Sequence, residues 1–427
     1  DLSMRMKKLL FATCCIAFLS GSLGAAAQKK SAARNVLTQT LKGKSWSADN
    51  GNGTFTNPLF YDEFSDPDII RVGEDYYLAG TTMHSVPGLV VLHSKDLVNW
   101  EFSSYCFDRF DDSDDFNLRN GKEAYGQGIW APAIRYHNGK FYIFSNINGH
   151  GLQVYISDSA KGSWTHHKIN GDIYDLSMLF DDDGKIYAVH KYGNVTVTEL
   201  KPDLSGPVEG SSKVVIPEGN AMGEGHHVYK INGMYYILSA DYSPMGRMQC
   251  ARSKSIWGPY ETCVISERES FGYAAGWSVG NMGIGRPLPE DGFKFQNNQP
   301  NGVNLGCATI HQGGIVQAPD GKWWGVSMQD FNAVGRTVCL SPITWVDGWP
   351  YFGLEKNLGR SPRTWFKPND KVKTPQAPYD RCDDFSGKTF KSVWQWNHNP
   401  NDKMWSLNKE RKGWLRLHSM PAKQLLW

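Results

Sequence analysis

The stretch that decides the fold is KINGMYYILS, residues 230–239, in which an Asn-Gly pair separates two apolar runs. Asn-Gly between alternating apolar residues is the strongest short-range signal for a β-hairpin. An apolar strand, a glycine-centred turn and a strand with aromatic residues also occur in RVGEDYYLAG (71–80), YHNGKFYIFS (136–145), DDDGKIYAVH (181–190) and APDGKWWGVS (318–327). The sequence therefore predicts five hairpins in series.

A third apolar run follows each hairpin and ends in a corner of Ser, Asp or Trp. Examples are HSKDLVNW (93–100) after the first hairpin and ISDSAKGSW (156–164) after the second. A unit of three or four antiparallel strands thus repeats five times, and radial repetition of small sheets is how a propeller limits its exposed sheet edges. We predict an all-β fold, a five-bladed β-propeller; a β-sandwich built from hairpins is the alternative.

Composition agrees with a turn-rich β protein. The 427 residues include 44 Gly, 21 Pro and 16 Trp, and 13% are aromatic. The 45 Lys and Arg nearly balance the 43 Asp and Glu, which leaves a formal net charge of +2. Such a balance offers no basic surface to nucleic acid or to an anionic membrane, so we expect neither partner.

The beginning of the sequence predicts two segments ahead of the propeller. A basic pair, a short apolar run and an Ala-rich cleavage site form the pattern of a secretory signal peptide over residues 1–27. We therefore expect a secreted or periplasmic protein that has no membrane contact after cleavage. Residues 28–55 are expected to be a mobile lead-in, and the propeller is expected over residues 56–372.

The starts of the five predicted inner strands lie seven to ten residues before the turn glycines. In blade order these positions hold Asp66, Trp130, Asp175, Glu224 and His311. Inner strands converge on a propeller axis, so these side chains should ring one end of the central channel. Each has a structural alternative, such as a turn, a cap or a core residue.

Three of these five side chains are carboxylates, which repel one another unless function holds them together. Clustered carboxylates serve glycosidic hydrolysis, which needs an acid and a base or nucleophile. They also serve a hard cation such as Ca²⁺. The spacing alone leaves both chemistries open.

The sequence around these positions resembles glycoside hydrolase family 43, whose members are five-bladed propellers acting on β-xylosides and α-L-arabinofuranosides. The resemblance covers about residues 57–350. It is carried by NPLFYDEFSDPDIIRVGEDYYL (57–78), IWAPAIRYHNGKFYIF (129–144), YDLSMLFDDDGKIY (174–187), GEGHHVYKINGMYYILSA (223–240), HQGGIVQAPDGKWW (311–324) and VGRTVCLSPITWVDGWP (334–350). Leu176 stands where the family more often has proline.

The resemblance implies an inverting, exo-acting glycosidase that releases xylose or arabinose from xylan, arabinoxylan or derived oligosaccharides and requires no cofactor. It implies that Asp66 is the general base and Glu224 the general acid. Asp175 would raise the pKa of that acid. Arg336 would contact the sugar; a surface arginine on a strand is the alternative.

Three further residues are candidates for substrate contact. Trp130 is expected to stack on a sugar face, with core packing as its alternative. His84, which follows the first hairpin, is expected at the pocket rim. Two roles stay open for His311, binding of a structural Ca²⁺ near the axis through ordered water or a hydrogen bond to a carboxylate.

The remaining expectations concern the end of the chain, the cysteines and other functions. Residues 373–427 resemble a linker and the incomplete start of a C-terminal β-sandwich. Cys250 and Cys263 are expected on adjacent strands, as a disulfide or as two buried thiols. An endo-acting arabinanase and a non-catalytic carbohydrate-binding propeller are the alternative functions. All three functions imply a plant cell-wall polysaccharide or oligosaccharide as partner, and oligomeric state stays open.

Overall fold

The computed structural model describes residues 47–220, 222–241, 247–266, 306–307, 311–330, 335–359, 361–369, 371–372 and 383–420. In these ranges every regular element is a β-strand. They contain no helix that is long and apolar enough to cross a membrane. The predicted signal peptide (1–27) and the linker part 373–382 lie outside the described residues.

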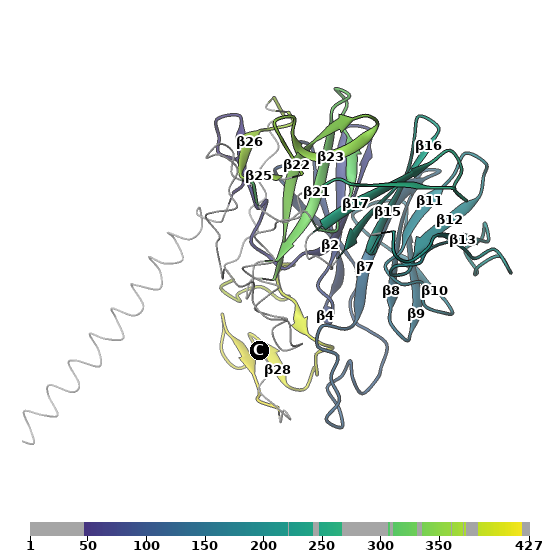
Figure 1. Ribbon diagram of the computed structural model, residues 1–427. Helices are drawn as coiled ribbons and strands as arrows, with labels where there is room; N and C mark the ends of the chain where they lie inside the picture. The colour runs from purple at the N-terminus through teal and green to yellow at the C-terminus, as the bar shows by residue number, and fades with distance from the viewer. Residues whose placement is uncertain are drawn as a thin grey trace, which may run out of the picture.

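Five antiparallel sheets are arranged as the blades of a propeller, as predicted (Figure 1). Blade 1 contains β2 (Ser65–Val72), β3 (Asp75–Thr81), β5 (Gly88–Ser94) and β6 (Glu101–Phe107). Blade 2 contains β7 (Ile129–His137), β8 (Lys140–Ile147), β9 (Gly151–Ser157) and β10 (Thr165–Ile169). Blade 3 contains β11 (Ser177–Phe180), β12 (Ile186–His190), β13 (Val195–Leu200) and β14 (Lys213–Ile216).

The last two blades follow the same order from the inner to the outer strand. Blade 4 contains β15 (Glu224–Ile231), β16 (Met234–Asp241), β17 (Arg247–Ser253) and β18 (Glu261–Val264). Blade 5 contains β20 (Ile315–Gln317), β21 (Trp323–Asp330), β22 (Arg336–Val346), β23 (Trp349–Leu354) and β24 (Asn357–Leu358). Four two-stranded pairs complete the fold: β1 (Thr54–Thr56) with β26 (Thr364–Phe366), β4 (Ser85–Val86) with β27 (Trp396–Asn397), β19 (Gly306–Cys307) with β25 (Ser361–Pro362), and β28 (Trp405–Leu407) with β29 (Leu415–Leu417).

The predicted hairpins are the inner hairpins of the blades. The five turn glycines, Gly73, Gly139, Gly184, Gly233 and Gly321, have φ between +62° and +85°. In blade 4 both central turn residues have positive φ, +52° at Asn232 and +77° at Gly233, which is the type I′ geometry that matches strand twist.

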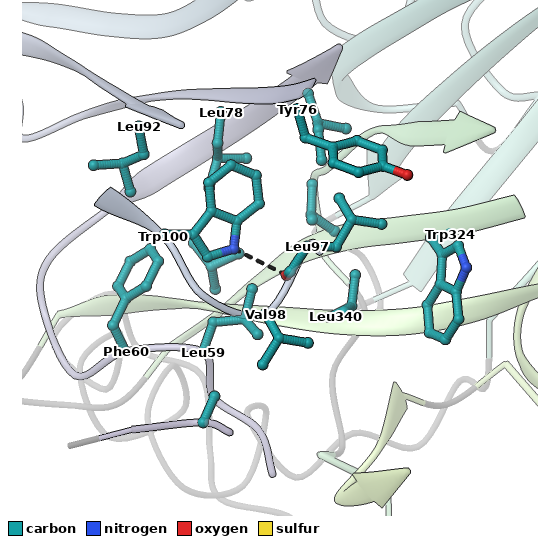
Figure 2. Packing of buried hydrophobic residues seen from close by; sticks show 14 of the residues in the cluster. Leu59, Phe60, Tyr76, Leu78, Leu92, Leu97, Val98, Trp100, Trp324 and Leu340 are labelled. Atoms are coloured by element: carbon teal, nitrogen blue, oxygen red, sulfur yellow. Dashed lines mark hydrogen bonds between the residues drawn. The ribbon is translucent and has the colours of Figure 1, made fainter. Parts of the chain in front are cut away.

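The hydrophobic core is divided into five clusters, one between each pair of adjacent blades. Figure 2 shows the cluster between blades 1 and 5, which includes Leu78 of blade 1 and Trp324 and Leu340 of blade 5. In the same cluster the indole N–H of Trp100 donates to the Leu97 carbonyl at 2.9 Å. Burying each large apolar side chain contributes roughly 1.5 to 3 kcal/mol, so these interfaces hold the ring together.

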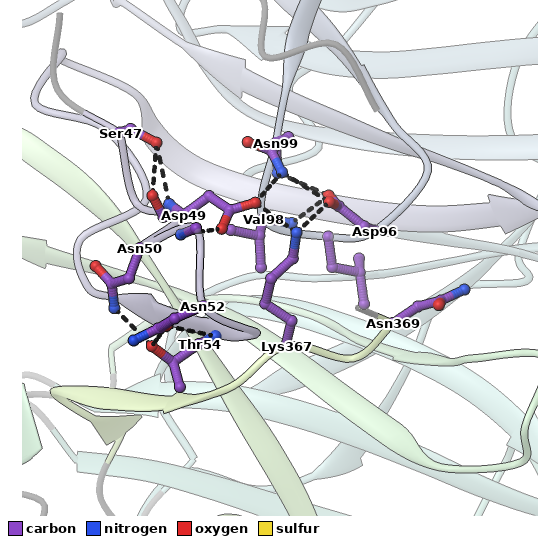
Figure 3. A network of polar contacts seen from close by, with 12 residues as sticks. Ser47, Asp49, Asn50, Asn52, Thr54, Asp96, Val98, Asn99, Lys367 and Asn369 are labelled. Atoms are coloured by element: carbon purple, nitrogen blue, oxygen red, sulfur yellow. Dashed lines mark hydrogen bonds and ion pairs between the residues drawn. The ribbon is translucent and has the colours of Figure 1, made fainter. Parts of the chain in front are cut away.

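The ring closes where the beginning of the propeller meets its end. Strand β1 pairs with β26, and the Asn57 amide donates to the carbonyls of Leu340 and Pro362 at 2.8 Å each. Beside this pair, Lys367 bonds Asp49 at 2.5 Å and Asp96 at 3.0 Å (Figure 3).

The described part of the predicted lead-in is residues 47–55. It includes the fully buried Phe55 and most of β1, which is hydrogen-bonded into a sheet. Residues 28–46 lie outside the described part of the chain.

The C-terminal segment, residues 383–420, packs onto the propeller. Strand β27 pairs with β4, which lies in the connection between β3 and β5 at the end of blade 1 where β2 begins. Asn399 fastens the same segment to the loop between β6 and β7, exchanging hydrogen bonds with the Phe110 backbone at 2.9 and 3.0 Å.

Cys250 and Cys263 lie opposite each other on β17 and β18, so the adjacent strands were predicted correctly. Both are free thiols, which rules out the disulfide alternative in this structure. The Cys263 sulfur lies 3.3 Å from the Tyr351 hydroxyl.

Candidate active site

The inner strands of three blades begin with a β-bulge. The pairing register slips by one residue between Ser65 and Asp68 in β2, between Ile129 and Pro132 in β7, and between Glu224 and His227 in β15. A bulge bends its strand and re-aims the side chains next to it. The candidate residues therefore come from irregular strand starts at one end of the propeller.

The bulges show that the repeat positions are offset by one residue. In its ladder Glu224 occupies the position that Ser65 and Ile129 occupy in theirs. The residue equivalent to Asp66 in blade 4 is therefore Gly225, not Glu224. Asp66 and Gly225 share positive φ values, +53° and +62°. Counting from the turn glycine therefore finds the correct strand end but not the same residue of each bulge.

The structure brings the three predicted carboxylates together. Asp66, Asp175 and Glu224 are 5%, 6% and 8% exposed. Burial raises the pKa of Asp175 well above its usual value, and the nearby charges of Glu224 and Asp66 raise it further. The positive charge of Arg336 and the Gly225 N–H, which donates to Asp175, oppose this rise. The pair Asp175 and Glu224 thus resists carrying two negative charges.

Arg336 lies against Asp66. Its Nη1 donates to the Ser65 hydroxyl at 2.9 Å and pairs with Asp66 Oδ1 at 3.3 Å. The Ser65 hydroxyl in turn donates to Asp66 Oδ2 at 2.9 Å. The Arg336 backbone N–H donates to the Glu63 carboxylate at 3.0 Å, which fixes the start of β22. Asp66 is therefore oriented from both of its oxygens.

Tyr174 is a site residue that the sequence reasoning missed. Its hydroxyl donates to Glu224 Oε2, and its ring packs edge-on against Trp130 with centroids 5.7 Å apart. The available signal was its position next to Asp175. Tyr174 is not one of the repeat positions, so the search by spacing passed over it. It links the predicted acid to the predicted stacking residue.

His311 is buried beside the charge of Arg336, and the two effects lower the pKa of His311 to about 3. It is therefore neutral at physiological pH. The described residues contain no group of three or more His, Cys, Asp or Glu that could hold a metal ion. Ca²⁺ takes six to eight oxygen ligands. Binding of Ca²⁺ at His311 through ordered water, a hydrogen bond from His311 to a carboxylate and contact with the substrate all stay predictions.

His84 lies at the contact with the C-terminal segment. Its Nδ1 accepts the Gly126 N–H at 3.1 Å, and its ring packs against Tyr125 and His398 at 5.0 and 4.8 Å between centroids. Within the described ranges no contact joins His84 to the three carboxylates. Its expected place at the pocket rim stays a prediction.

Two family patterns and several known proteins match this chain. The sequence pattern described as Glycosyl hydrolases family 43 matches residues 55–269, and that of the Beta xylosidase C-terminal Concanavalin A-like domain matches residues 382–426. A putative beta-xylosidase of Xylanibacter ruminicola is 33% identical over 90% of this chain and 66% of its own length. A non-reducing end alpha-L-arabinofuranosidase of Bacteroides ovatus is 33% identical over 85% of this chain and 65% of its own length.

A solved structure gives the same result. A bifunctional GH43-CE protein of Bacteroides eggerthii has a TM-score of 0.70 and 33% identity, covering 87% of this chain and 44% of that one. The chain thus spans less than two-thirds of the length of these relatives. The matched propeller pattern covers half of the chain, and the predicted family is confirmed. The chain belongs to glycosyl hydrolases family 43.

Proposed function

We propose that this chain is an inverting glycoside hydrolase that removes xylose or arabinose from the non-reducing ends of hemicellulose. The observation that supports this most directly is the cluster of Asp66, Asp175 and Glu224, three buried carboxylates from three blades. Such a cluster is unfavourable for stability, so its presence favours a catalytic role. Relatives named beta-xylosidase and alpha-L-arabinofuranosidase support the two candidate sugars.

In the proposed mechanism Asp66 is the general base. Its contacts with Arg336 and Ser65 stabilise the ionised carboxylate, which is the form that accepts a proton from water. The activated water attacks the anomeric carbon from the face opposite the leaving group. We propose that Arg336, which lies against Asp66, also contacts the bound sugar.

Glu224 is the proposed general acid, and it protonates the departing glycosidic oxygen. Asp175 and Glu224 disfavour each other's ionisation, so the pair retains a proton in conditions where an isolated carboxylate would lose it. Tyr174 holds the Glu224 side chain in one orientation. Protonation of the leaving oxygen by Glu224 and deprotonation of water by Asp66 complete hydrolysis with inversion.

The test is hydrolysis of nitrophenyl β-xyloside and nitrophenyl α-L-arabinofuranoside, with NMR detection of the first anomer released. Asp66→Asn should lower kcat on these glycosides by about 10³-fold or more while preserving the fold. Glu224→Gln should do so on xylo- or arabino-oligosaccharides, whose poor leaving groups need protonation. Asp181→Asn, a buried carboxylate at the hairpin turn of blade 3, is the control and should retain kcat. Absence of activity on both glycosides, or a retained anomer, would overturn the proposal.

The inverting assignment also predicts a distance. The Asp66 and Glu224 carboxyl groups should lie roughly 6.5 to 9.5 Å apart, because the attacking water needs room between base and sugar. A crystal structure with bound xylose or arabinose measures this separation. A value near 5 Å would instead support a retaining mechanism.

We also propose that the protein is exported, on the basis of the pattern in residues 1–27. Expression of the full chain in a Gram-negative host, followed by fractionation and N-terminal sequencing, tests this. A mature protein that begins near Gln28 outside the cytoplasm is expected. An uncleaved cytoplasmic chain would contradict export.

A further inference from the structure

A buried arginine connects three blades close to the strand starts that carry the proposed catalytic carboxylates. Arg135 of blade 2 donates from Nη1 to Asp68 Oδ2 of blade 1 at 2.5 Å. Its Nη2 and Nε donate to the Ser177 hydroxyl at 2.7 Å and to the Met178 carbonyl at 2.5 Å, both in blade 3. The side chains of Arg135 and Asp68 are 13% and 1% exposed. Because the guanidinium is planar and rigid, its N–H groups fix the directions of these three partners relative to one another.

The same network continues into blade 4. The Ser177 hydroxyl also accepts the Val228 N–H at 2.9 Å. His227 Nδ1 lies 3.0 Å from the Gly225 carbonyl, and its Nε2 lies 3.2 Å from the Pro67 carbonyl in blade 1. Four side chains, which we call the axial clamp, form this network: Asp68, Arg135, Ser177 and His227.

The axial clamp contacts the chain immediately next to each catalytic carboxylate. His227 contacts the carbonyls of Pro67 and Gly225. Pro67 directly follows Asp66, and Gly225 directly follows Glu224. Asp68 and Ser177 lie two residues after Asp66 and Asp175. In the described sheets no ladder pair joins the inner strands of two blades. Contacts outside the ladders therefore set the relative positions of the three strand starts, and these include side-chain contacts between blades and the backbone bond from the Gly193 N–H to the Gly223 carbonyl at 3.1 Å.

We propose that Arg135 and the other axial clamp residues are positioning residues that hold the base and acid carboxylates at the separation that inversion needs. This inference rests on the proposed hydrolase function. A buried ion pair is weak evidence for stability, because apolar residues of similar volume often stabilise a protein as well or better. A role in positioning explains a planar arginine fork between three blades better. A displacement of a catalytic group by about 1 Å can lower a catalytic rate about 100-fold.

The decisive variant is Arg135→Lys, which keeps the buried charge but removes the planar fork. We expect kcat on nitrophenyl β-xyloside, or on the arabinofuranoside if that is the better substrate, to fall about 10- to 100-fold with KM nearly unchanged. The matched control is Lys367→Arg, a charge-conserving change in another buried ion-pair network. That network lies where β1 meets β26, and its Asp96 is in the turn after β5, at the opposite end of blade 1 from Asp66. Lys367→Arg should retain kcat.

A second variant separates positioning from folding. Arg135→Met combined with Asp68→Asn removes both buried charges and leaves no unpaired carboxylate, so the chain should fold with a near-UV circular dichroism spectrum like that of the wild type. We expect the double variant to recover the Tm lost in Arg135→Met but not its kcat. Both clamp variants should also change the spacing of the two limbs of the pH profile, because coupling between carboxylates depends on their distance.

Two outcomes would overturn the inference. One is a wild-type kcat and pH profile in Arg135→Lys together with a loss of Tm, since this would make the clamp purely structural. The other is full recovery of kcat in the double variant. Failure of the hydrolase proposal is distinguishable, because the wild-type protein itself would then hydrolyse neither glycoside.

Discussion

Asp175 shows how function opposes stability at the scale of one residue. Burial, with the charges of Glu224 and Asp66 beside it, raises the pKa of this carboxyl. Between its unfolded and folded pKa values the folded chain binds more protons than the unfolded chain, so the free energy of unfolding falls as pH rises. Asp175 is therefore least favourable to folding at neutral and alkaline pH.

Replacing Asp175 by Asn should therefore stabilise the protein at pH 8 and abolish most of its activity. The gain should be about 1 kcal/mol or more at pH 8 and should nearly vanish by about pH 3, where the carboxyl is mostly protonated in both states. Urea unfolding at the two pH values measures it.

Asp181→Asn is the matched control for Asp175→Asn and should have the opposite effect. Burial alone would raise the pKa of Asp181, but hydrogen bonds from Lys230 and Tyr235 outweigh it and lower that pKa. The carboxylate of Asp181 therefore stabilises the fold above its unfolded pKa. Loss of stability in both variants at pH 8 would contradict this account.

Gly225 is a second residue at the site where one substitution should change activity, because there is no room for a Cβ atom. It has φ +62°, and a Cβ placed on it would lie 2.3 Å from the Gln312 side chain. Its N–H also donates to Asp175. Gly225→Ala should therefore lower kcat at least about 10-fold, because Gln312 or the bulge has to move by about an ångström.

The turn glycine Gly233 provides the control. Its φ is +77°, but nothing lies within 4 Å of its added Cβ. Gly233→Ala should lower stability by about 1 kcal/mol through backbone strain alone and leave kcat unchanged. Equal loss of activity in both variants would show that Gly225 has no particular role beside Asp175.

At the scale of elements, the hairpins were predictable because their signal is local. Asn232-Gly233 determines its own φ values, and the flanking strands alternate in sequence. The one-residue offset between Asp66 and Glu224 was not predictable, because a bulge is defined by the partner strand. Tyr174 and Arg135 were missed for a related reason, since their partners lie 42 to 67 residues away.

The loop between β6 and β7 is hydrogen-bonded to the C-terminal segment. Asn399 receives the Phe110 N–H and donates to the Phe110 carbonyl and to Asn117 Oδ1 at 2.9 to 3.0 Å. Each hydrogen bond contributes about 1 kcal/mol. Asn399→Ala should therefore accelerate hydrogen exchange of the Phe110 amide by about 10-fold or more.

The same substitution elsewhere in the segment is the control for this docking. Among the described residues, the Asn408 side chain bonds Gly387 and Gly413, both inside residues 383–420. Asn408→Ala should leave exchange at Phe110 unchanged. Faster exchange there in both variants would mean that docking responds to the stability of the segment and not to Asn399 itself.

At the scale of the whole molecule, buried histidines make the propeller sensitive to acid. Burial lowers the pKa of His226 and His398 to about 4, and of His190 and His311 to about 3. Each is neutral in the folded chain and protonated in the unfolded chain between roughly pH 4 and 6.5. The stability that their neutral forms provide is present above pH 6.5 and is lost as pH falls toward 4.

We expect the free energy of unfolding to decrease from pH 7 to pH 4.5, with each histidine adding up to about 1.4 kcal/mol per pH unit. Urea titrations across this range measure the slope. His226→Gln, which lies outside the proposed catalytic groups, should reduce that slope by up to about 1.4 kcal/mol per unit. An unchanged slope, or greater stability at pH 4.5, would contradict the assignment.

Because β1 pairs with β26, near the other end of the propeller, the ring can close only late in synthesis. The face of blade 1 that carries Leu78 lacks its blade 5 partners until Trp324 and Leu340 have been translated. At about 5 to 20 residues per second, the roughly 250 intervening residues leave this face open for about 12 to 50 s. A nascent propeller therefore exposes an apolar surface for most of its translation, and this surface is buried only when the fifth blade folds against it. Completion of the ring is thus the step that distinguishes a finished chain from an aggregation-prone one.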